Sequence, residues 1–461
     1  MRLSRRNFVK KTTLGGIGIT LLGEGGISEA FSAPTILQGK DDRIVRLGFI
    51  GVGGMGTNLL RSCLTMQDVE IQAICDIDPK AMSRALGLVE ESGRKCPDEY
   101  SKDEEDYLNL VVRDDIDAVV IATPWLWHTP MCIAAMKAGK HVAPEVWGAS
   151  TIEECWELVK TAEETSMQCM MLENHCFDRI EMSVLKMVRD GLFGEMLHYE
   201  CGYCHDLRDV KFRPGAEFGP GSEGEARWRT VHSQKRNGDL YPTHGLGPVA
   251  NCMNDNRGNR MVSLTSTATK AKGLHEYIIQ QGGKEHSNAS IDWALGDIIT
   301  TVIKTHKGET VTITHDTNLS RPYSNNMMVQ GSKGIWMYYR DLCNSLHIER
   351  RSGRHRWEPW ENYIPEFEHP LWKRFSSEGV RGDHGGSGYL KIRSFVECIK
   401  SNIPTPIDVY DTAAWIVVTP LSERSIALGS TPVEFPDFTN GKWLTNKPIF
   451  GLTDRFSDDT K

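Results

Sequence analysis

Short apolar stretches alternate with helix-like stretches in the part of the chain that begins near Arg43. The first, Arg43–Ile50, runs straight into a glycine-rich turn, and a helix-like run follows at Thr57–Thr65. Further apolar stretches lie at Val69–Cys75, Asp117–Ala122 and Lys140–Val146, with another helix-like run at Pro130–Ala138. Continuous apolar runs separated by helices are typical of parallel strands that are buried on both faces. The pattern therefore predicts an α/β fold that starts with a doubly wound domain over residues 43–173.

Strand-like segments predominate after residue 174, and helix-like segments return near the end. We expect strands at Met196–Tyr203, Asp297–Thr305, Thr310–Thr317 and Asn326–Gln330, then helices at Gly388–Ser401 and Asp411–Leu428. Strands followed by helices favour an α+β arrangement. We predict a second, α+β domain over 174–437 with an open, mostly antiparallel sheet and helices on one face, and a tail over 438–461. Irregular structure is predicted for Phe212–Arg227, Lys270–Ser290 and Glu349–Gly386.

The first 33 residues differ in character from the rest. Five basic residues and no acidic one fall among the first eleven, and Arg5 and Arg6 are adjacent. The uncharged, glycine-rich stretch at 12–23 is too short and too mildly apolar to span a bilayer. This arrangement indicates a twin-arginine signal peptide over 1–33, the alternative being a frayed helix with two chance arginines. We expect export by the twin-arginine machinery to the periplasm or the extracellular space.

The composition narrows the class of protein. The 461 residues are 39% hydrophobic and 25% charged, which is the balance of a globular chain. A net charge of −8 argues against a nucleic-acid partner. Twelve cysteines are too few for a disulfide scaffold in a chain of this length. Cys201 and Cys204 have CxxC spacing without a second pair, and on a strand they would face opposite sides, so we expect structural thiols and no metal.

The glycine-rich turn has the GxGxxG spacing of a dinucleotide-binding loop. Gly51 permits the tight turn, Gly53 lets the backbone approach a pyrophosphate, and Gly56 lets the next helix pack closely on its strand. The second strand ends in Asp76, 20 residues beyond Gly56, where a carboxylate can hold the ribose hydroxyls. Because an acid there disfavours a 2′-phosphate, the motif predicts a Rossmann domain that binds NAD. The alternative is a glycine-rich turn in some other βαβ unit.

Two more of the predicted strands end in residues suited to a ligand. Trp125–His128 follow one strand, and Glu145 follows another. Ligands of such sheets bind at the carboxyl ends of the strands. Tryptophan is most often a core residue, but two tryptophans and a histidine at one strand end favour the wall of a pocket.

Together these segments resemble the Gfo/Idh/MocA superfamily of sugar oxidoreductases. The resemblance lies in Gly51–Gly56, Asp76, Ala122–Pro124 with His128, and Ala138–Val142 ahead of Glu145. Dehydrogenases of that superfamily usually have Glu-Lys-Pro at the last site, and their lysine serves as a catalytic acid or base. This chain has Glu145-Val146-Trp147, so the usual proton carrier is absent there.

The second half resembles glycoside hydrolase family 109, the NAD-dependent α-N-acetylgalactosaminidases. The matching segments are Met170–Asn174, Gly191–Glu195, Gln234–Pro248, His315–Thr317 and Ser320–Ser324, together with Glu145 and Val146. The resemblance implies NAD contacts at Gly54, Met55, Asp76, Trp125, Leu126, Trp127, His128, Glu145, Val146, Asn174 and Tyr241. It implies substrate contacts at Tyr203, Arg229, Tyr241, Pro242, Thr243, His244 and Tyr323.

The family implies an unusual route to hydrolysis. NAD takes hydride from C3 of the sugar, a base removes the proton at C2, the glycosidic oxygen leaves, water adds, and the hydride returns. NAD is regenerated in each turnover, so it is expected to be tightly bound and recycled, which suits a protein folded before export. His244 and Tyr241 are the candidate proton carriers. Glu145 would orient the nicotinamide or shift the pKa of a neighbour.

One departure bears on activity, because relatives often have Tyr where this chain has Phe177. Two other functions therefore stay open: a sugar oxidoreductase with net oxidation, and a non-catalytic carbohydrate-binding protein with structural NAD. We expect a small carbohydrate or glycan as the partner. A homo-oligomer also stays open, since dimers and higher forms are common in the superfamily. His384 lies in a predicted loop that could approach the pocket.

Overall fold

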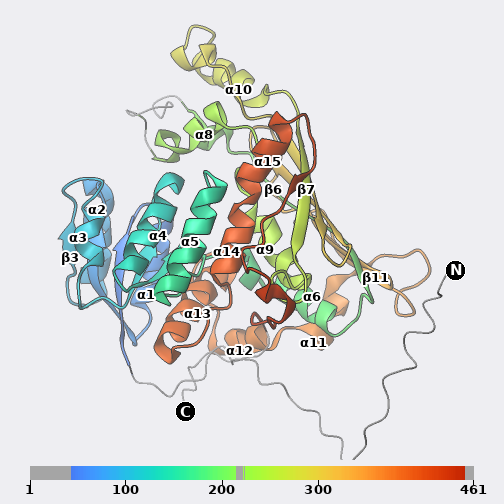
Figure 1. Ribbon diagram of the computed structural model, residues 1–461, viewed down its shortest axis with the longest axis horizontal. Coiled ribbons are helices and arrows are strands. Elements are labelled where there is room, and N and C mark those ends of the chain that lie inside the picture. Colours follow the sequence, from blue (N-terminus) through green and yellow to red (C-terminus); the bar gives the residue numbers. More distant parts are fainter. Residues whose placement is uncertain (1–42, 214–221, 223, 452–461) are drawn as a thin grey trace, which may run out of the picture. The chain divides into compact units, whose positions relative to one another are not determined.

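The computed structural model describes residues 43–213, 222 and 224–451 (Figure 1). The predicted signal peptide at 1–33 and the last ten residues of the predicted tail lie outside this range. None of the helices in the described part is both long and apolar enough to cross a membrane.

The N-terminal part is a five-stranded parallel sheet in the order β3-β2-β1-β4-β5. Its strands are β1 (Val45–Ile50), β2 (Val69–Cys75), β3 (Asp98–Tyr100), β4 (Ala118–Ile121) and β5 (His141–Pro144). Its helices are α1 (Gly54–Leu64), α2 (Pro79–Glu91), α3 (Tyr107–Val111), α4 (His128–Lys137) and α5 (Ile152–Thr165). The strand order reverses between β1 and β4, which is where such sheets bind ligands. The predicted Rossmann fold is confirmed.

The second sheet has nine strands in the order β13-β12-β11-β10-β6-β9-β8-β7-β14. They are β6 (Met196–Cys204), β7 (Met261–Ala268), β8 (Ile298–Thr305), β9 (Thr310–Asp316), β10 (Met327–Gly331), β11 (Gly334–Tyr338), β12 (Asn344–Ile348), β13 (Glu358–Pro359) and β14 (Val433–Glu434). Within the described part of this sheet, only β6 and β9 pair in parallel. An open, mostly antiparallel sheet was predicted, and the structure confirms it.

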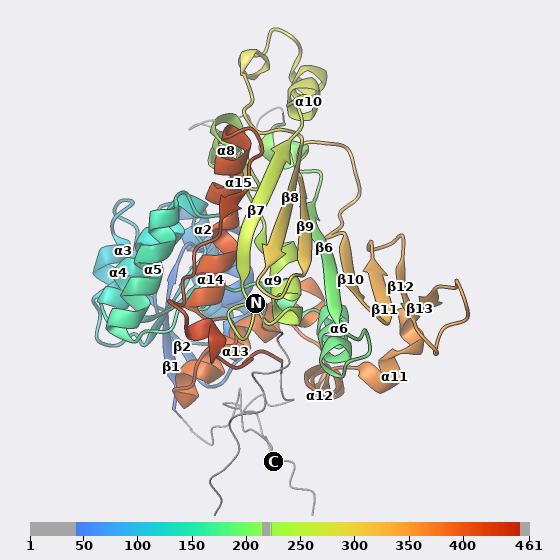
Figure 2. The ribbon, with the colours of Figure 1, turned by 45° about the vertical axis from the view of Figure 1, so that its right-hand side comes forward.

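Helices of the second half lie between the two sheets (Figure 2). They include α9 (Thr243–Cys252), which packs on β6, and α14 (Val409–Ile416) and α15 (Val418–Ala427), which pack on α5 and β7 respectively. Helix α13 (Ser387–Ser401) returns to the first sheet, where it packs against α1, β1 and β5. The remaining helices are α6 (Arg179–Arg189), α7 (Arg208–Lys211), α8 (Arg229–Lys235), α10 (Gly273–Gly282), α11 (Ile364–Phe367) and α12 (Pro370–Glu378).

Two segments predicted to be irregular contain helices, so those predictions were wrong. Lys270–Ser290 contains α10, whose Leu274 and Ile278 form a small separate core with Phe212. Helix α10 was not predicted because glycines occupy both of its ends and its apolar face is short. Glu349–Gly386 contains β13, α11 and α12, and α12 buries Leu371, Trp372 and Phe375. Phe212–Arg227, predicted to be a loop, falls partly outside the described residues and ends in a 3-10 turn, η4 (Gly224–Arg227).

The helix predicted over Asp411–Leu428 is two helices, α14 and α15. Pro420 has no N–H to donate to the carbonyl of Ile416, so the helical hydrogen-bond ladder is interrupted there. Strands β3, β7 and β11 to β14 were not predicted from the sequence.

Candidate active site

The glycine-rich loop between β1 and α1 has the shape that a pyrophosphate requires. Gly51 has φ +85°, and a Cβ there would lie 2.7 Å from the carbonyl atoms of Ala122. A Cβ at Gly56 would lie 2.1 Å from the carbonyl oxygen of Gly51. At Gly53 and Gly54, by contrast, a Cβ would meet nothing within 4 Å, and no side chain caps the start of α1. The outer glycines therefore shape the turn, while the middle two leave open space and free N–H groups.

Asp76 stands at the carboxyl end of β2 and braces this loop. One carboxylate oxygen accepts from the N–H of Val52 at 2.7 Å, and the other accepts from the N–H of Asp78 at 2.8 Å. A carboxylate offers about four acceptor positions. Half-buried Asp76 can therefore hold the loop and still accept from ribose hydroxyls.

Asn174 supplies an amide suited to the same ligand. It begins η3 (Asn174–Phe177), is 3% exposed, and its side-chain N–H₂ has no partner among the residues that the structure describes. A buried donor left without a partner costs free energy unless a ligand satisfies it. The open glycines, the uncapped helix and this amide together fit NAD.

The predicted cofactor contacts at 125–128 do not all face one place. The Trp125 ring lies 5.3 Å from the Tyr241 ring. Trp127 instead packs on Tyr107, and Leu126 is 56% exposed. His128 is buried, its Nε2–H donates to the carbonyl of Thr123, and burial lowers its pKa to about 4.

Several predicted substrate contacts gather around Tyr241. The Tyr203 ring lies 4.5 Å from the Tyr241 ring, and the Arg229 guanidinium lies 4.6 Å from the Trp125 ring centre. Tyr203 is also 6.0 Å from Tyr323, ring centre to ring centre. Trp125 thereby joins the dinucleotide-binding edge of the first sheet to aromatic side chains of the second half.

His244, whose side chain is 13% exposed, pairs with the fully buried Glu173. Its Nδ1 lies 2.8 Å from one carboxylate oxygen of Glu173 and 3.0 Å from the other. A Cβ at Gly245 would lie 2.5 Å from the backbone of Gly202, and one at Gly247 would lie 3.0 Å from Glu173. The two glycines thus let α9 lie directly on β6 and bring His244 to Glu173.

The electrostatics of this pair suit a general base. Burial opposes ionisation of Glu173, but pairing with His244 and the nearby His175 lower its pKa to about 2. Burial lowers the pKa of His244, and Glu173 partly offsets this. Near neutral pH the carboxylate accepts Nδ1–H of a neutral imidazole, so Nε2 is left as an acceptor. Sequence reasoning missed Glu173, although it directly follows the apolar run at 170–172.

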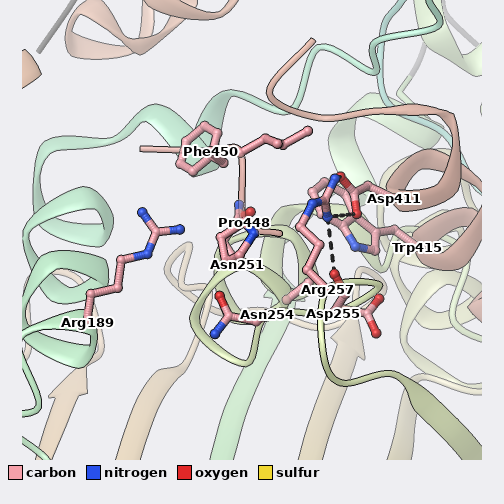
Figure 3. Close-up of a pocket in the computed structure, with 11 residues that line it drawn as sticks. Arg189, Asn251, Asn254, Asp255, Arg257, Asp411, Trp415, Pro448 and Phe450 are labelled. Carbon is pink, nitrogen blue, oxygen red and sulfur yellow. Dashed lines mark hydrogen bonds and ion pairs between the residues drawn. The ribbon is translucent and has the colours of Figure 1, made fainter. Parts of the chain in front are cut away.

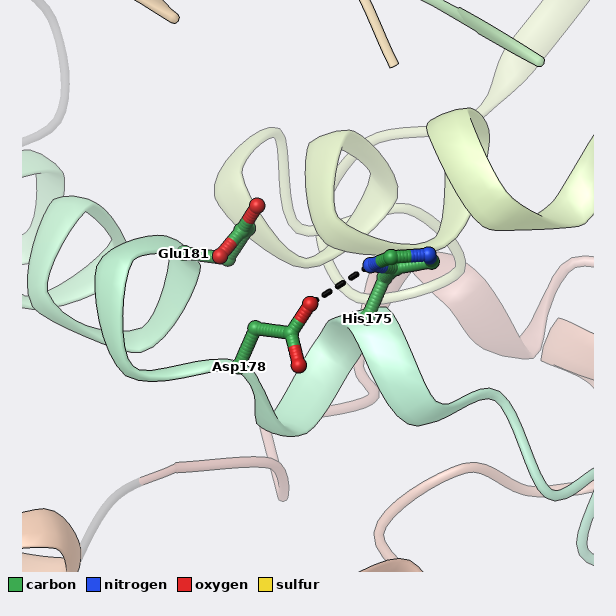
Figure 4. Close-up of side chains that lie close together, drawn as sticks. All are labelled: His175, Asp178 and Glu181. Atoms are coloured by element: carbon green, nitrogen blue, oxygen red, sulfur yellow. Dashed lines mark hydrogen bonds and ion pairs between the residues drawn. The ribbon is translucent and has the colours of Figure 1, made fainter. Parts of the chain in front are cut away.

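His175 and Asp178 form a second hydrogen-bonded pair (Figure 4), and the His175 ring centre lies 4.6 Å from that of His244. The His175 Nδ1 lies 2.5 Å from Asp178, and its Nε2 lies 2.9 Å from the Tyr323 hydroxyl. Ligand-type atoms of His175, Asp178 and Glu181 lie within 4.8 Å of one another, an arrangement that can hold a metal ion. Both ring nitrogens of His175 already have partners, however, so we assign the group to proton sharing.

Glu145 pairs with a lysine that sequence reasoning also missed. Lys391 Nζ, on α13, lies 2.6 Å from Glu145, and both side chains are buried. Val146, which replaces the usual lysine of the superfamily, is itself buried. Lys391, which lies 246 positions after Glu145 in the sequence, therefore places a lysine at the end of β5, where Val146 replaces the usual one.

The other sequence candidates lie as follows. Phe177 is buried against Phe450, with ring centres 5.0 Å apart. Pro242 and Thr243 are buried at the start of α9. His384 pairs with Asp383 and has a side chain that is 41% exposed. Cys201 and Cys204 are buried free thiols, as predicted.

A small pocket elsewhere holds none of the predicted site residues (Figure 3). Within it Arg257 donates to the Asp411 carboxylate and to the backbone carbonyl of Asp255, and it also donates to Asp408 nearby. We assign this buried ion cluster a structural role.

A Rossmann domain with a dinucleotide-shaped loop, joined to an open-sheet domain that presents a carboxylate-held histidine, defines a cofactor-dependent enzyme. Comparison with known families agrees. Residues 45–173 match the NAD-binding Rossmann fold of the oxidoreductase family, and residues 177–445 match the C-terminal domain of glycosyl hydrolase 109. The chain belongs to glycosyl hydrolase family 109, which confirms the predicted family and the predicted enzyme class.

Individual relatives support this assignment. An α-N-acetylgalactosaminidase from Tannerella forsythia is 43% identical over 98% of this chain and 100% of its own length. A glycosyl hydrolase family 109 protein from Stenotrophomonas maltophilia (strain K279a) is 46% identical over 90% of this chain and 93% of its own. The fold also matches levoglucosan dehydrogenase in complex with NADH, with a TM-score of 0.62 and 16% identity, covering 86% of this chain and 100% of that one.

Proposed function

We propose that this protein is an NAD-dependent glycosidase that hydrolyses α-N-acetylgalactosaminides or a related glycoside. The observation that carries the proposal is the Glu173–His244 pair, joined through Tyr241 and Trp125 to the dinucleotide-binding edge. The name of the Tannerella forsythia relative supports the choice of sugar.

NAD, when bound, would accept a hydride from the sugar and return it, and we propose that it is held tightly and recycled. The residues that would hold it are Gly51, Gly53, Gly54, Met55, Gly56, Asp76, Trp125 and Asn174. Glu145, held by Lys391, would orient the nicotinamide. This arrangement needs no lysine at Val146.

The proposed proton chemistry centres on His244. Its Nε2 would take a proton from the sugar, while Glu173 fixes the tautomer and stabilises the imidazolium that forms. General acid–base catalysis of this kind contributes about 10²- to 10⁴-fold. Burial raises the pKa of Tyr241, the opposite of what a base requires, so we assign its hydroxyl the role of hydrogen-bond donor. Tyr203, Arg229 and Tyr323 would bind the sugar.

A panel of glycosides tests the proposal. Purified protein is incubated with chromogenic glycosides and with free sugars, and no cofactor is added. Aglycone release from the N-acetylgalactosaminide, with no net NADH, is the expected result. Stoichiometric NADH with sugar oxidation would replace the proposal by a net oxidoreductase. Binding without either product would replace it by a carbohydrate-binding protein.

We also propose export by the twin-arginine pathway to the periplasm or beyond, with residues 1–33 removed. Arg5 and Arg6 support this proposal. Conversion of both to Lys should retain the precursor in the cytoplasm, as measured by cell fractionation. Native mass spectrometry of the exported protein should detect bound NAD, and an exported protein without it would refute export with the cofactor inside.

A further inference from the structure

Hydrogen bonds join three side chains that take no part in the proposed chemistry of His244, those of His175, Asp178 and Tyr323. We call this group the His175 relay. Asp178 accepts from Nδ1 of His175 at 2.5 Å, and Nε2 lies 2.9 Å from the Tyr323 hydroxyl. The link joins residues 148 positions apart in the sequence, between η3 and the segment before β10. The His175 relay therefore forms only when the protein has folded.

The His175 relay runs from a buried histidine to a more exposed tyrosine, and it lies beside the Glu173–His244 pair. His175 is 8% exposed, whereas Tyr323 is only half-buried. The His175 ring meets the His244 ring edge to face, with centres 4.6 Å apart. Tyr323 also borders Tyr203, a predicted substrate contact. The Tyr323 hydroxyl thus lies where a proton can pass between the protein and a bound sugar.

The charges around His175 favour its protonated form. Burial by itself would lower the pKa of His175, but Asp178, Glu173 and Glu181 raise it to about 9. Glu181 is itself buried, and its pKa is raised to about 8 by burial and by Asp178. The other ionisable groups near His175, Glu181 and Tyr323 are His244, the Tyr338 hydroxyl and Arg340. The Arg340 guanidinium lies 4.7 Å from the Tyr323 ring centre. The carboxylates of Asp178 and Glu173 outweigh burial, so His175 is an imidazolium at neutral pH.

The direction of the hydrogen bonds follows from that charge. An imidazolium donates from both nitrogens. Nδ1–H is donated to Asp178, and Nε2–H is donated to the phenolic oxygen of Tyr323. The side chain of Asn325 also hydrogen-bonds Tyr323, and burial raises the pKa of the Tyr323 hydroxyl. The phenolic hydrogen is therefore retained at neutral pH and can be donated to a strongly basic oxygen such as a departing alkoxide.

We propose that Tyr323 is the general acid for the leaving group, and that the His175–Asp178 pair replaces the proton it gives. This inference rests on the proposed glycosidase function.

The protons and electron pairs of the elimination and water-addition steps balance. When the bond between the anomeric carbon and the glycosidic oxygen breaks, its electron pair stays on that oxygen, which takes the phenolic proton of Tyr323. The phenolic oxygen takes the Nε2 proton of His175, which becomes neutral with Nδ1–H held by Asp178. When water adds, its hydroxyl goes to the anomeric carbon, and its proton returns through Tyr323 to His175. His244 removes the C2 proton and gives it back.

Leaving-group dependence tests the relay. The substrates are a methyl and a 2,4-dinitrophenyl N-acetylgalactosaminide, because the second leaves without protonation. In His175→Gln and in Tyr323→Phe, kcat/KM for the methyl glycoside should fall about 10²-fold or more, with a much smaller loss for the dinitrophenyl glycoside. His198→Gln and Tyr339→Phe are matched controls on β6 and after β11, and both should leave the two rates unchanged. Equal losses for the two substrates would overturn the relay and leave Tyr323 with a binding role.

A measurement independent of activity tests the same assignment. In NMR of the protein with labelled histidine, the ring signal absent from His175→Gln should titrate near pH 9, and Asp178→Asn should lower that pKa. A His175 ring that is neutral at pH 7 would overturn the relay. Failure of the unchanged protein to release any aglycone would overturn the proposed function itself, and the NMR titration separates that outcome from failure of the relay.

Discussion

At the scale of single residues, the His244 pair depends on one carboxylate. Glu173→Gln keeps an acceptor for Nδ1–H but removes the charge that stabilises the imidazolium, so kcat should fall by about 10²-fold or more. Loss of the negative charge should also lower the pKa of His244, because Glu173 is what raises it against burial. The acid limb of the kcat/KM profile should therefore move to lower pH. Glu366→Gln, at an exposed pair with Arg351, is the control, and an unchanged profile in Glu173→Gln would contradict the role of this pair.

The glycines of the dinucleotide loop make a second residue-scale prediction. Gly56→Ala should destabilise the fold, because its Cβ would lie 2.1 Å from the carbonyl oxygen of Gly51. Gly53→Ala has no atom within 4 Å of its Cβ, so the fold should persist while bound NAD is lost. Thermal melting and the NAD content of the purified variants measure the two effects. Full NAD content in Gly53→Ala would place the pyrophosphate elsewhere.

Site residues that belong to a local motif could be predicted from the sequence, and those defined by a distant partner could not. Gly51 and Asp76 lie in a motif whose spacing predicts their role, and His244 lies in a segment whose resemblance to the family implies its role. Glu173 becomes meaningful only through His244, 71 positions away, and Lys391 only through Glu145, 246 positions away. No local pattern separates such residues from ordinary buried polar groups.

At the scale of elements, α13 is attached to the first sheet by a buried ion pair. Lys391→Met would leave the Glu145 carboxylate buried without its partner, which costs about 3–5 kcal/mol. The double variant Lys391→Met/Glu145→Leu removes both charges and should recover most of the stability. Thermal and urea unfolding of the three proteins give the comparison. If the double variant were no more stable than Lys391→Met, packing of the lysine stem would account for the loss instead.

Element prediction succeeded where the apolar pattern was continuous, as in β1 and β4, and also where it alternated, as in β8. The strands β1, β2, β4 and β8 were found within a few residues, since their inward faces are almost wholly buried. The edge strands β13 and β14 are two residues long and owe their pairing to their neighbours, so no pattern marks them. Helix α12 was missed because its three apolar side chains face a core built from distant segments.

At the scale of the whole molecule, helices from the later part of the sequence pack against the first sheet and its helices. Helix α13 covers β1 and β5, and α14 packs on α5. The sequence predicted two sheets in the correct order, but it could not predict that helices near residue 400 would return to the first sheet. Such long-range packing depends on the shapes of both partners and not on either pattern alone.

The redox state and burial of the cysteines bear on the proposed export route. All twelve are free thiols, and ten of them are buried, which leaves exposed Cys96 and half-buried Cys343. Burial raises the pKa of the inner thiols, Cys63 to about 12 for instance, which suppresses the reactive thiolate. A chain that folds before it leaves the reducing cytoplasm should keep all of them reduced.

Protein recovered from the exported fraction should therefore titrate twelve thiols after denaturation. In the native state a thiol reagent should modify Cys96 first and Cys343 more slowly, with the buried ten protected. A reducing agent should leave the melting temperature unchanged. The variant Cys96→Ser serves as the control, because it should abolish the fast phase and nothing else. Fewer than twelve thiols in the denatured exported protein would mean that disulfides formed outside, and would argue against folding before export.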